Sequence, residues 1–498
     1  MELASINNKV DWTKEQRQAP VGLILFSVDV FRKLIKGLWP FVLIAFFNTG
    51  NEKRAELYFW LILVGIAFIV VNAVLTYWFY KFQIVNDEFV VKKGYLKKIK
   101  LSVPLDRIQT INIKQNIIQK VLKVVSLEIE TAGTQDSEIE LIAIKEATAE
   151  ALKKIFQAKI KQKSGTEDFP KKTKSLILSL DFVDLIKVAL SENHIRSFFI
   201  VTGVLMGLYY QVKDVFEEEA NRLAEESYQT LESMSYELYF WLFIFILIFS
   251  VFISFSRILL RFYNFKLTKT EAAFKIRFGL LNTKELSVPL SKIQLISWHK
   301  NPLRNWLNYQ TLKIKQASST ERIKKLPSIE IPACKWSHRE IIERELFGTQ
   351  EILFSNQYKT HSLYFLRSFL VASILFLLPS IGFLWHEFYY WIAFIVFELF
   401  MLVMLILAYQ KRYFRISESQ IEISKGKVAQ TIYRLPNFKI QSLAFEQNIF
   451  TKKRALASIV IYTASGENLT IPYISEKLAL DLYNFLLYKI ESTEQNWM

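Results

Sequence analysis

Three stretches of the chain share one pattern: KKGYLKKIKLSVPLDRIQTINI from Lys92, RFGLLNTKELSVPLSKIQLISW from Arg277, and SKGKVAQTIYRLPNFKIQSLAF from Ser424. In each stretch a glycine is followed ten residues later by a proline, and a glutamine comes five residues after the proline. These signature positions are Gly94, Pro104, Gln109, Gly279, Pro289, Gln294, Gly426, Pro436 and Gln441. Because chance does not keep two spacings in three ungapped copies, the sequence predicts a triplicated module.

Within each copy the apolar residues alternate as they do in strands. Leu127–Glu130 and Ile421–Ile423 place every second apolar residue on one face, which predicts half-buried strands. The glycine is expected at a hairpin turn with positive φ, and the proline is expected to enter a following strand. Each copy then closes with a helical pattern, over Glu146–Ile160, Ser337–Leu346 and Ser475–Ile490. About seven short strands and a terminal helix predict a small antiparallel barrel closed by a helix.

Long apolar segments precede each copy. The chain is 51% hydrophobic with 41 phenylalanines, and this is concentrated in Leu57–Phe79, Leu238–Leu260 and Tyr389–Tyr409. Each of these can cross a hydrocarbon layer of about 30 Å as a helix, and Trp and Tyr gather at their ends. A second apolar segment lies upstream of each one: Gly37–Phe47, Ile195–Tyr210 and Leu363–Trp385. The sequence therefore predicts six spans arranged as three helix hairpins.

Charge indicates how these hairpins are oriented. The loop Gln211–Glu237 carries eight acidic and two basic residues in a chain whose net charge is +16. Lysine and arginine instead follow the apolar segments, as at Lys81 and Lys411. By the positive-inside rule the three copies are expected in the cytoplasm and the acidic loop outside.

These features divide the chain into eight parts. They are a polar N-terminus (1–20), membrane helices 1 and 2 (21–80), repeat 1 (81–163), a linker with an amphipathic segment (164–194), membrane helices 3 and 4 (195–261) around the external loop 211–237, repeat 2 (262–348), membrane helices 5 and 6 (349–410) and repeat 3 (411–498). The expected fold class is membrane α-helical plus β, with repeated barrels alternating with helix hairpins.

The string VPLDRIQTINIKQNIIQKVLKVVSLEIETAG, at Val103–Gly133, resembles the signature of bacterial pleckstrin-homology (PH) domain membrane proteins. Repeat 2 replaces the final Thr-Ala-Gly by Gln316-Ala317-Ser318, whereas repeat 3 keeps Thr463-Ala464-Ser465. The resemblance covers nearly the whole chain and is to the multi-repeat members of the family. It implies three PH-like barrels and a bacterial inner-membrane location, and it implies no reaction.

Residues that carry chemistry are scarce. The five histidines lie in different segments without metal-ligand spacing, and the single Cys334 excludes a disulfide within the chain and a thiolate cluster. No phosphate loop, nucleophile elbow or zinc motif is present, so we expect no enzyme, metal or cofactor. Glu398 is the one clear charge within an apolar helix, and its alternatives are pairing with a polar group, protonation, or a role with an ion or proton.

A basic cluster surrounds the turn of the first copy. It consists of Lys92, Lys93, Lys97, Lys98 and Lys100. Each cation near an anionic leaflet contributes about 1 kcal/mol, so adhesion to lipid needs no pocket. A specific site for an anionic lipid or a peptide, and simple solubility, are the alternatives. Nucleic acid is not expected, because Tyr95 alone is no stacking platform.

Two functions remain open at this point. The first is a non-enzymatic membrane scaffold whose cytoplasmic repeats bind one another, a partner protein, a second copy of the chain or anionic lipid headgroups. The second is an export, resistance or transport factor that uses the helices as a path. The helices disfavour transport, since Pro40 and Pro379 are the few breaks within them and no polar midplane site is visible.

Overall fold

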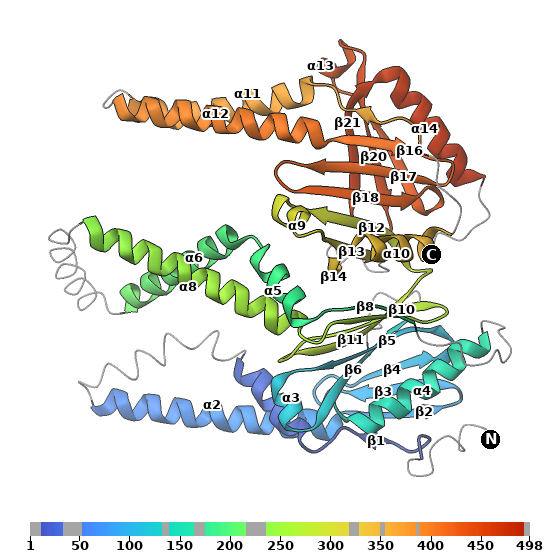
Figure 1. Ribbon diagram of the computed structural model, residues 1–498. Helices are drawn as coiled ribbons and strands as arrows, with labels where there is room; N and C mark the ends of the chain where they lie inside the picture. The colour runs from blue at the N-terminus through green and yellow to red at the C-terminus, as the bar shows by residue number, and fades with distance from the viewer. Residues whose placement is uncertain are drawn as a thin grey trace. The chain divides into compact units, whose positions relative to one another are not determined.

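The computed structural model describes residues 11–32, 52–131, 139–163, 175–215, 236–317, 328–348, 354–384 and 388–492 (Figure 1). These residues form two compact units. Unit 1 comprises Met1–Lys174, Ser179–Leu267 and Lys275–Ser287, and unit 2 comprises Ser175–Leu178, Thr268–Phe274 and Val288–Met498. Both units combine antiparallel sheets with long apolar helices.

The first sheet belongs to repeat 1 and has the strand order β1-β2-β3-β4. Its strands are β1 (Gln16–Arg17), β2 (Lys81–Val85), β3 (Glu88–Lys93) and β4 (Ile99–Pro104). The short β1 precedes the long apolar helix Glu52–Phe79 in the chain, yet Gln16 pairs with Phe82 just after that helix. A strand from before the helices thus completes the sheet that follows them.

The second sheet extends across two repeats, with the order β7-β6-β5-β11-β10-β9-β8. Its strands are β5 (Ile108–Gln115), β6 (Val124–Thr131), β7 (Ile139–Lys145), β8 (Ser175–Ser179), β9 (Lys266–Lys269), β10 (Ala273–Phe278) and β11 (Thr283–Pro289). The second half of repeat 1 therefore continues into the first half of repeat 2. We had expected self-contained barrels, and this sharing of sheets was not predicted.

The third sheet repeats this arrangement within unit 2, with the order β14-β13-β12-β18-β17-β16-β15, and a fourth sheet has the order β19-β20-β21. The third sheet contains β12 (Ile293–Lys300), β13 (Gln310–Gln316), β14 (Ile329–Cys334), β15 (Tyr358–Lys359), β16 (Tyr413–Ile416), β17 (Gln420–Gly426) and β18 (Gln430–Pro436). The fourth contains β19 (Ile440–Glu446), β20 (Leu456–Thr463) and β21 (Asn468–Ser475).

A helix closes each repeat, as predicted. These helices are α4 (Glu146–Lys163), α10 (Trp336–Phe347) and α14 (Glu476–Glu491). The Ser475 hydroxyl caps α14 by accepting a hydrogen bond from the Leu478 amide. In repeat 1 the core joins both sheets to α4, where the ring of Phe89 meets that of Phe156 edge-on at 5.3 Å. Packing against the sheets, rather than helix propensity, therefore orders these helices.

Long helices extend from the sheets. They are α2 (Glu52–Phe79), α6 (His194–Val215), α8 (Tyr236–Phe262), α11 (Leu363–Leu384) and α12 (Phe388–Lys411), with the shorter α5 (Phe182–Leu190) before α6. Rings of Phe198 and Phe243 join α6 to α8, and rings of Phe365 and Tyr409 join α11 to α12. These contacts define two helix pairs.

Two of the described helices are long and apolar enough to cross a bilayer, over Phe243–Phe262 in α8 and Phe394–Lys411 in α12. The predicted first segment, Gly37–Phe47, lies outside the described residues, and so does most of the loop 211–237. Six spans in three complete hairpins therefore stay a prediction.

The signature glycines occupy equivalent turns. Gly94, Gly279 and Gly426 have φ of +88°, +107° and +150°, which confirms the expected positive φ. The expectation for the prolines was wrong. Each proline is the last residue of its strand (β4, β11 or β18) and does not enter the following one. A single turn of 3₁₀ helix follows the proline at Leu105–Arg107 and at Asn437–Lys439, because the chain must change direction before the next strand begins.

Candidate functional site

The basic cluster lies on the hairpin formed by β3 and β4. Pairing places Lys92 opposite Lys100, so the structure brings the five predicted lysines onto one hairpin. Lys92 forms a local ion pair, because its ammonium contacts the Glu15 carboxylate at 2.6 Å, a carboxylate it shares with Lys81. Hydrogen bonds from Lys81 and Lys92 lower the pKa of Glu15 to about 2. The exposed charges of the cluster are Lys97, Lys98 and Lys100.

Each glycine turn contacts the end of the long helix before it. In unit 1 the Asn72 amide in α2 donates to the Tyr95 hydroxyl at 3.0 Å, and the Gly279 amide donates to the Tyr263 carbonyl just after α8 at 2.9 Å. In unit 2 the Lys411 ammonium at the end of α12 donates to the Val428 carbonyl at 2.5 Å. The turns therefore lie at the end of each repeat from which the apolar helices leave.

Short helices add exposed apolar side chains at the same end. They are α3 (Ile117–Val121), α9 (Pro302–Trp306) and α13 (Ile449–Lys452). In Figure 1 each lies at the end of its sheets from which the long helices of its own unit extend. The exposed residues are Ile117, Val121, Leu303, Trp306, Ile449 and Phe450, with exposed fractions of 40% to 81%.

The sequence contained a signal for these helices that we did not use. An asparagine stands seven residues after each signature glutamine, at Asn116, Asn301 and Asn448. Its side chain accepts a hydrogen bond from a backbone amide of the first helical turn in all three copies. Asparagine is a preferred N-cap, so the spacing marks the start of each short helix. We name the six exposed residues of these helices the apolar tips.

The first junction between repeats is the pairing of β5 with β11 in unit 1. Glu285 lies opposite Ile113, and Thr283 lies opposite Gln115. The Glu285 carboxylate accepts a hydrogen bond from the Lys153 ammonium in α4 at 2.5 Å. Burial opposes ionisation of Glu285, but the hydrogen bond and charge of Lys153 outweigh it and lower the pKa of that carboxyl.

The second junction is the pairing of β12 with β18 in unit 2. It extends from Ile296 opposite Arg434 to Lys300 opposite Gln430. Its register equals that of the first junction. In both junctions, the residue four positions before the signature proline faces the residue four positions after the signature glutamine. Glu285 faces Ile113 in the first junction, and Ile432 faces Trp298 in the second. The repeated signature thus corresponds to a repeated pairing between modules.

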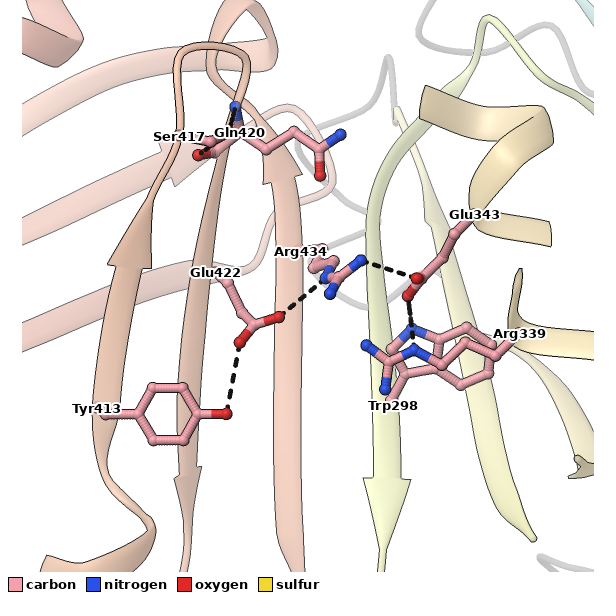
Figure 2. Close-up of polar contacts among 8 residues, drawn as sticks. All are labelled: Trp298, Arg339, Glu343, Tyr413, Ser417, Gln420, Glu422 and Arg434. Carbon is pink, nitrogen blue, oxygen red and sulfur yellow. Dashed lines mark hydrogen bonds and ion pairs between the residues drawn. The ribbon is translucent and has the colours of Figure 1, made fainter. Parts of the chain in front are cut away.

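A polar ladder links the two repeats across the second junction (Figure 2). The Glu343 carboxylate of α10 accepts hydrogen bonds from the Trp298 indole at 2.9 Å and from Arg339 at 2.8 Å. Its other oxygen contacts Arg434 at 2.8 Å, and Arg434 donates to Glu422 at 2.9 Å. These charges are largely buried and mutually paired, so loss of one partner leaves another uncompensated.

Lys439 fastens the loops at the same junction. This side chain is 7% exposed, and its ammonium donates to the carbonyls of Ser291 at 2.7 Å and Ile293 at 2.6 Å. A cavity of about 250 Å³ lies beside it, lined from repeat 2 by Gln294 and from repeat 3 by Pro436, among others. It falls below the volume of about 300–1,000 Å³ typical of small-molecule sites.

Glu398 lies in α12 and pairs with its neighbouring helix. The Ser373 hydroxyl of α11 donates to Glu398 Oε2 at 2.8 Å. Among the described residues, Oε1 is buried and has no hydrogen-bond partner. The structure thus shows the pairing with a polar group that was one of the three alternatives.

No group of three or more His, Cys, Asp or Glu residues within the described ranges is placed to hold a metal ion. Cys334 is fully buried, and this burial raises the pKa of its thiol to about 12. His299, in the second junction, is held neutral at pH 7. Burial, followed by the charges of Lys313 and Arg304, lowers its pKa to about 4. The Thr431 hydroxyl lies 2.9 Å from its Nδ1.

Comparison with known proteins agrees with the threefold pattern. The family model described as bacterial PH domain matches three times, over residues 33–160, 210–347 and 368–490. The chain is 24% identical over 498 residues to the UPF0699 transmembrane protein YdbT of Bacillus subtilis (strain 168), and the match covers 96% of this chain and 99% of that protein. No solved structure gives a significant match. The three matches cover most of the sequence, and the chain belongs to the bacterial PH domain family.

Proposed function

We propose that the chain is a non-enzymatic integral membrane scaffold. Its PH-like repeats lie against the anionic cytoplasmic leaflet of a bacterial inner membrane and bind one another, and the apolar helices hold them there as a multi-pass protein. The observation that carries this proposal is the composition of the end of each repeat from which the helices leave.

That end combines apolar and basic groups. Apolar tips with exposed Trp306 and Phe450 lie there, together with turn residues such as Leu96, which is 89% exposed. Large apolar side chains that are exposed near the end of a membrane helix are typical of the headgroup region of the bilayer, where aromatic residues are enriched. Lys97 and Lys98 add cations that anionic lipid attracts. A scaffold that rests on the bilayer accounts for both features.

The junctions support the scaffold part of the proposal. Strand pairing between repeats and the buried Glu343–Arg434 ladder fix each repeat to the next within its unit, so the surface is built from several modules in sequence. The YdbT protein is named as a transmembrane protein, in agreement with a membrane location for the relative. No feature of the described helices favours a transport path over this role.

Depth-dependent quenching tests whether the tips enter the bilayer. Full-length protein carrying Phe450→Cys and Cys334→Ala is labelled with an environment-sensitive fluorophore and reconstituted in vesicles containing anionic lipid. Because Phe450 is 81% exposed, the substitution should leave the fold intact. We expect blue-shifted emission that is quenched by lipids with a shallow nitroxide.

The matched control is Tyr488→Cys, an exposed position near the end of α14. We expect a water-like spectrum and little quenching there. If the two positions give the same spectrum and the same quenching, the tips do not enter the bilayer and the proposal fails.

Orientation is tested in intact cells. Single cysteines replace Ser227, in the acidic loop, or Ser137, in repeat 1, on the Cys334→Ala background. A membrane-impermeant thiol reagent should label position 227 and spare position 137 until the cells are lysed. Labelling of 137 but not 227 in intact cells would reverse the proposed orientation.

A further inference from the structure

The strand pairing that forms the two internal junctions leaves two further sheet edges unused among the described strands. At each internal junction, the strand that contains the signature glutamine of one repeat pairs with the strand that ends at the signature proline of the next repeat. β5 takes β11, and β12 takes β18. Among the described strands, β4 of repeat 1 and β19 of repeat 3 lie at the edges of their sheets without such a partner. They are the two strands of this kind that neither internal junction uses.

Exposure shows the difference between used and unused edges. The residue directly after the signature glutamine is buried in both junctions, with Thr110 at 3% and Leu295 at 1%. The equivalent Ser442 in β19 is exposed. On the other side, Ile432 in β18 is buried, whereas its equivalent in β4, Lys100, is exposed, as is the neighbouring Ile99.

Lys439, which contacts loop carbonyls at the second junction, has an exposed equivalent in repeat 1. Lys439 lies three residues after its proline and is buried against the carbonyls of Ser291 and Ile293. Arg107 lies three residues after Pro104 and is exposed. In a further junction of the same kind, Arg107 would meet the carbonyls of Phe438 and Ile440, which stand at the positions of Ser291 and Ile293.

We propose that β19 of one copy of this chain pairs with β4 of a second copy, in the register of the two internal junctions. Ser102 then lies opposite Leu443, Lys100 opposite Phe445, and Ile99 opposite Glu446. The antiparallel pairing continues the sheets from one molecule to the next by strand addition.

A second copy is the occupant because both halves of the junction are present on the same chain. Exposed strand edges are usually blocked or covered, since they invite pairing with another chain. A contact between two different edges is head-to-tail, so it builds a ring or a row of copies rather than a closed twofold dimer. The scaffold of the proposed function then extends along the membrane in units of three repeats, and this inference deepens that proposal.

Disulfide trapping between two distinguishable copies tests the register. Two full-length chains with different affinity tags are co-expressed, one carrying Ile99→Cys and the other Glu446→Cys, both with Cys334→Ala. Neither chain alone holds both cysteines, so a bond between them reports contact between copies. We expect a disulfide-linked pair carrying both tags after mild oxidation of isolated membranes, and a particle mass above that of one chain in nanodiscs.

Two controls calibrate the bond. Thr431→Cys with His299→Cys in one chain places cysteines at the matching positions of the second junction, and this pair should close within the chain under the same oxidation. Lys100→Cys with Glu446→Cys is displaced by one residue. Because neighbouring side chains of a strand point to opposite faces, this pair should link at least several-fold less.

The outcomes separate the two proposals. Failure of the Ile99–Glu446 bond while the internal control closes, or equal yields for the in-register and displaced pairs, would overturn the head-to-tail contact. So would a mass of one chain in nanodiscs, or linkage of both cysteines to other proteins alone. Quenching at Phe450 is independent of these results, so the membrane scaffold is tested without the assembly.

Discussion

The two junctions between repeats share a backbone register but differ in chemistry. The first pairs three residues of β11 with β5, and the second pairs five residues of β18 with β12. The first is fastened by Lys153 and Glu285, whose carboxylate side chain is 34% exposed. The second contains Glu343, 16% exposed, which holds Trp298, Arg339 and Arg434 together. Conserving a register across repeats therefore requires no shared side-chain contact.

Backbone pairing and a common turn set where the strands meet, because the spacing from glycine to proline to glutamine is the same in every copy. Side chains then determine how strongly each junction holds. An exposed ion pair contributes about 0.2–1 kcal/mol, whereas breaking a buried one costs about 3–5 kcal/mol. The second junction is therefore expected to be the more stable of the two and the more sensitive to loss of one charge.

The largest effect is expected from Glu343→Gln. This substitution keeps the shape of the side chain but removes the ion-pair partner of Arg339 and leaves Arg434 with Glu422 alone in a largely buried site. We expect unit 2 to lose about 3–5 kcal/mol of stability. Thermal unfolding of the full-length protein in detergent, followed by tryptophan emission, measures the loss.

Glu285→Gln at the first junction is the matched comparison. Lys153 is 14% exposed and the carboxylate 34% exposed, and Glu285 has this single ion-pair partner, so we expect a smaller loss than for Glu343→Gln. Equal losses for the two variants would show that the ladder in Figure 2 contributes no more than the single Lys153–Glu285 ion pair.

Acid should weaken the second junction selectively. The pKa of His299 is about 4 in the folded chain against an ordinary value of 6.5, so the unfolded chain binds more protons between these two values. Stability from this neutral histidine is fully present above pH 6.5 and is lost as the pH falls toward 4. Unfolding midpoints of the wild type and His299→Gln at pH 7 and pH 5 measure it.

The variant should lose less stability than the wild type between these two values of pH, because it has no imidazole to protonate. A change in the unfolding midpoint of the variant as large as that of the wild type would assign the acid sensitivity to other groups.

A third effect is expected at the signature glycines, where an added Cβ strains the turn without changing a junction side chain. A Cβ at Gly279 would come within 2.1 Å of the Asn282 carbonyl oxygen, and at Gly94 within 2.1 Å of the Lys97 carbonyl oxygen. Strain at such a backbone conformation is of order 1–3 kcal/mol. We expect Gly279→Ala and Gly94→Ala each to lower the unfolding midpoint by a comparable amount. Gly65→Ala in α2, where a Cβ meets no atom within 4 Å, is the control and should be neutral or stabilising.

The smallest effect is expected at the basic turn. With Leu96→Cys labelled in full-length proteoliposomes, emission should shift further to the blue as the anionic lipid fraction rises. The double change Lys97→Gln and Lys98→Gln should reduce this shift, since each lysine contributes about 1 kcal/mol. Lys92→Gln should matter less, because that ammonium is half-buried and already paired with Glu15, whereas Lys97 and Lys98 are exposed. Equal effects of Lys92 and of the exposed pair would mean that total charge, not exposure, governs the contact.

The sequence predicted what depends on neighbouring residues. Positive φ at Gly94 and the terminal helix after β21 follow from spacing within a few residues, and both were found. Strands β1 and β15 have two residues each, too short for any period, and their partners lie beyond the long apolar helices. The Glu343–Arg434 contact joins residues from different repeats. Pairing at such long sequence separation leaves no local pattern, so it required the structure.

Disulfide trapping at the first junction tests most directly whether one repeat continues into the next in the shared register. The full-length chain carries Ile113→Cys and Glu285→Cys on the Cys334→Ala background, and a second version carries Asn112→Cys in place of Ile113→Cys. We predict rapid formation of an internal disulfide for Ile113 with Glu285, which face each other, and little for the displaced pair. Closure of the displaced pair at the same rate, or of neither pair, would contradict the account.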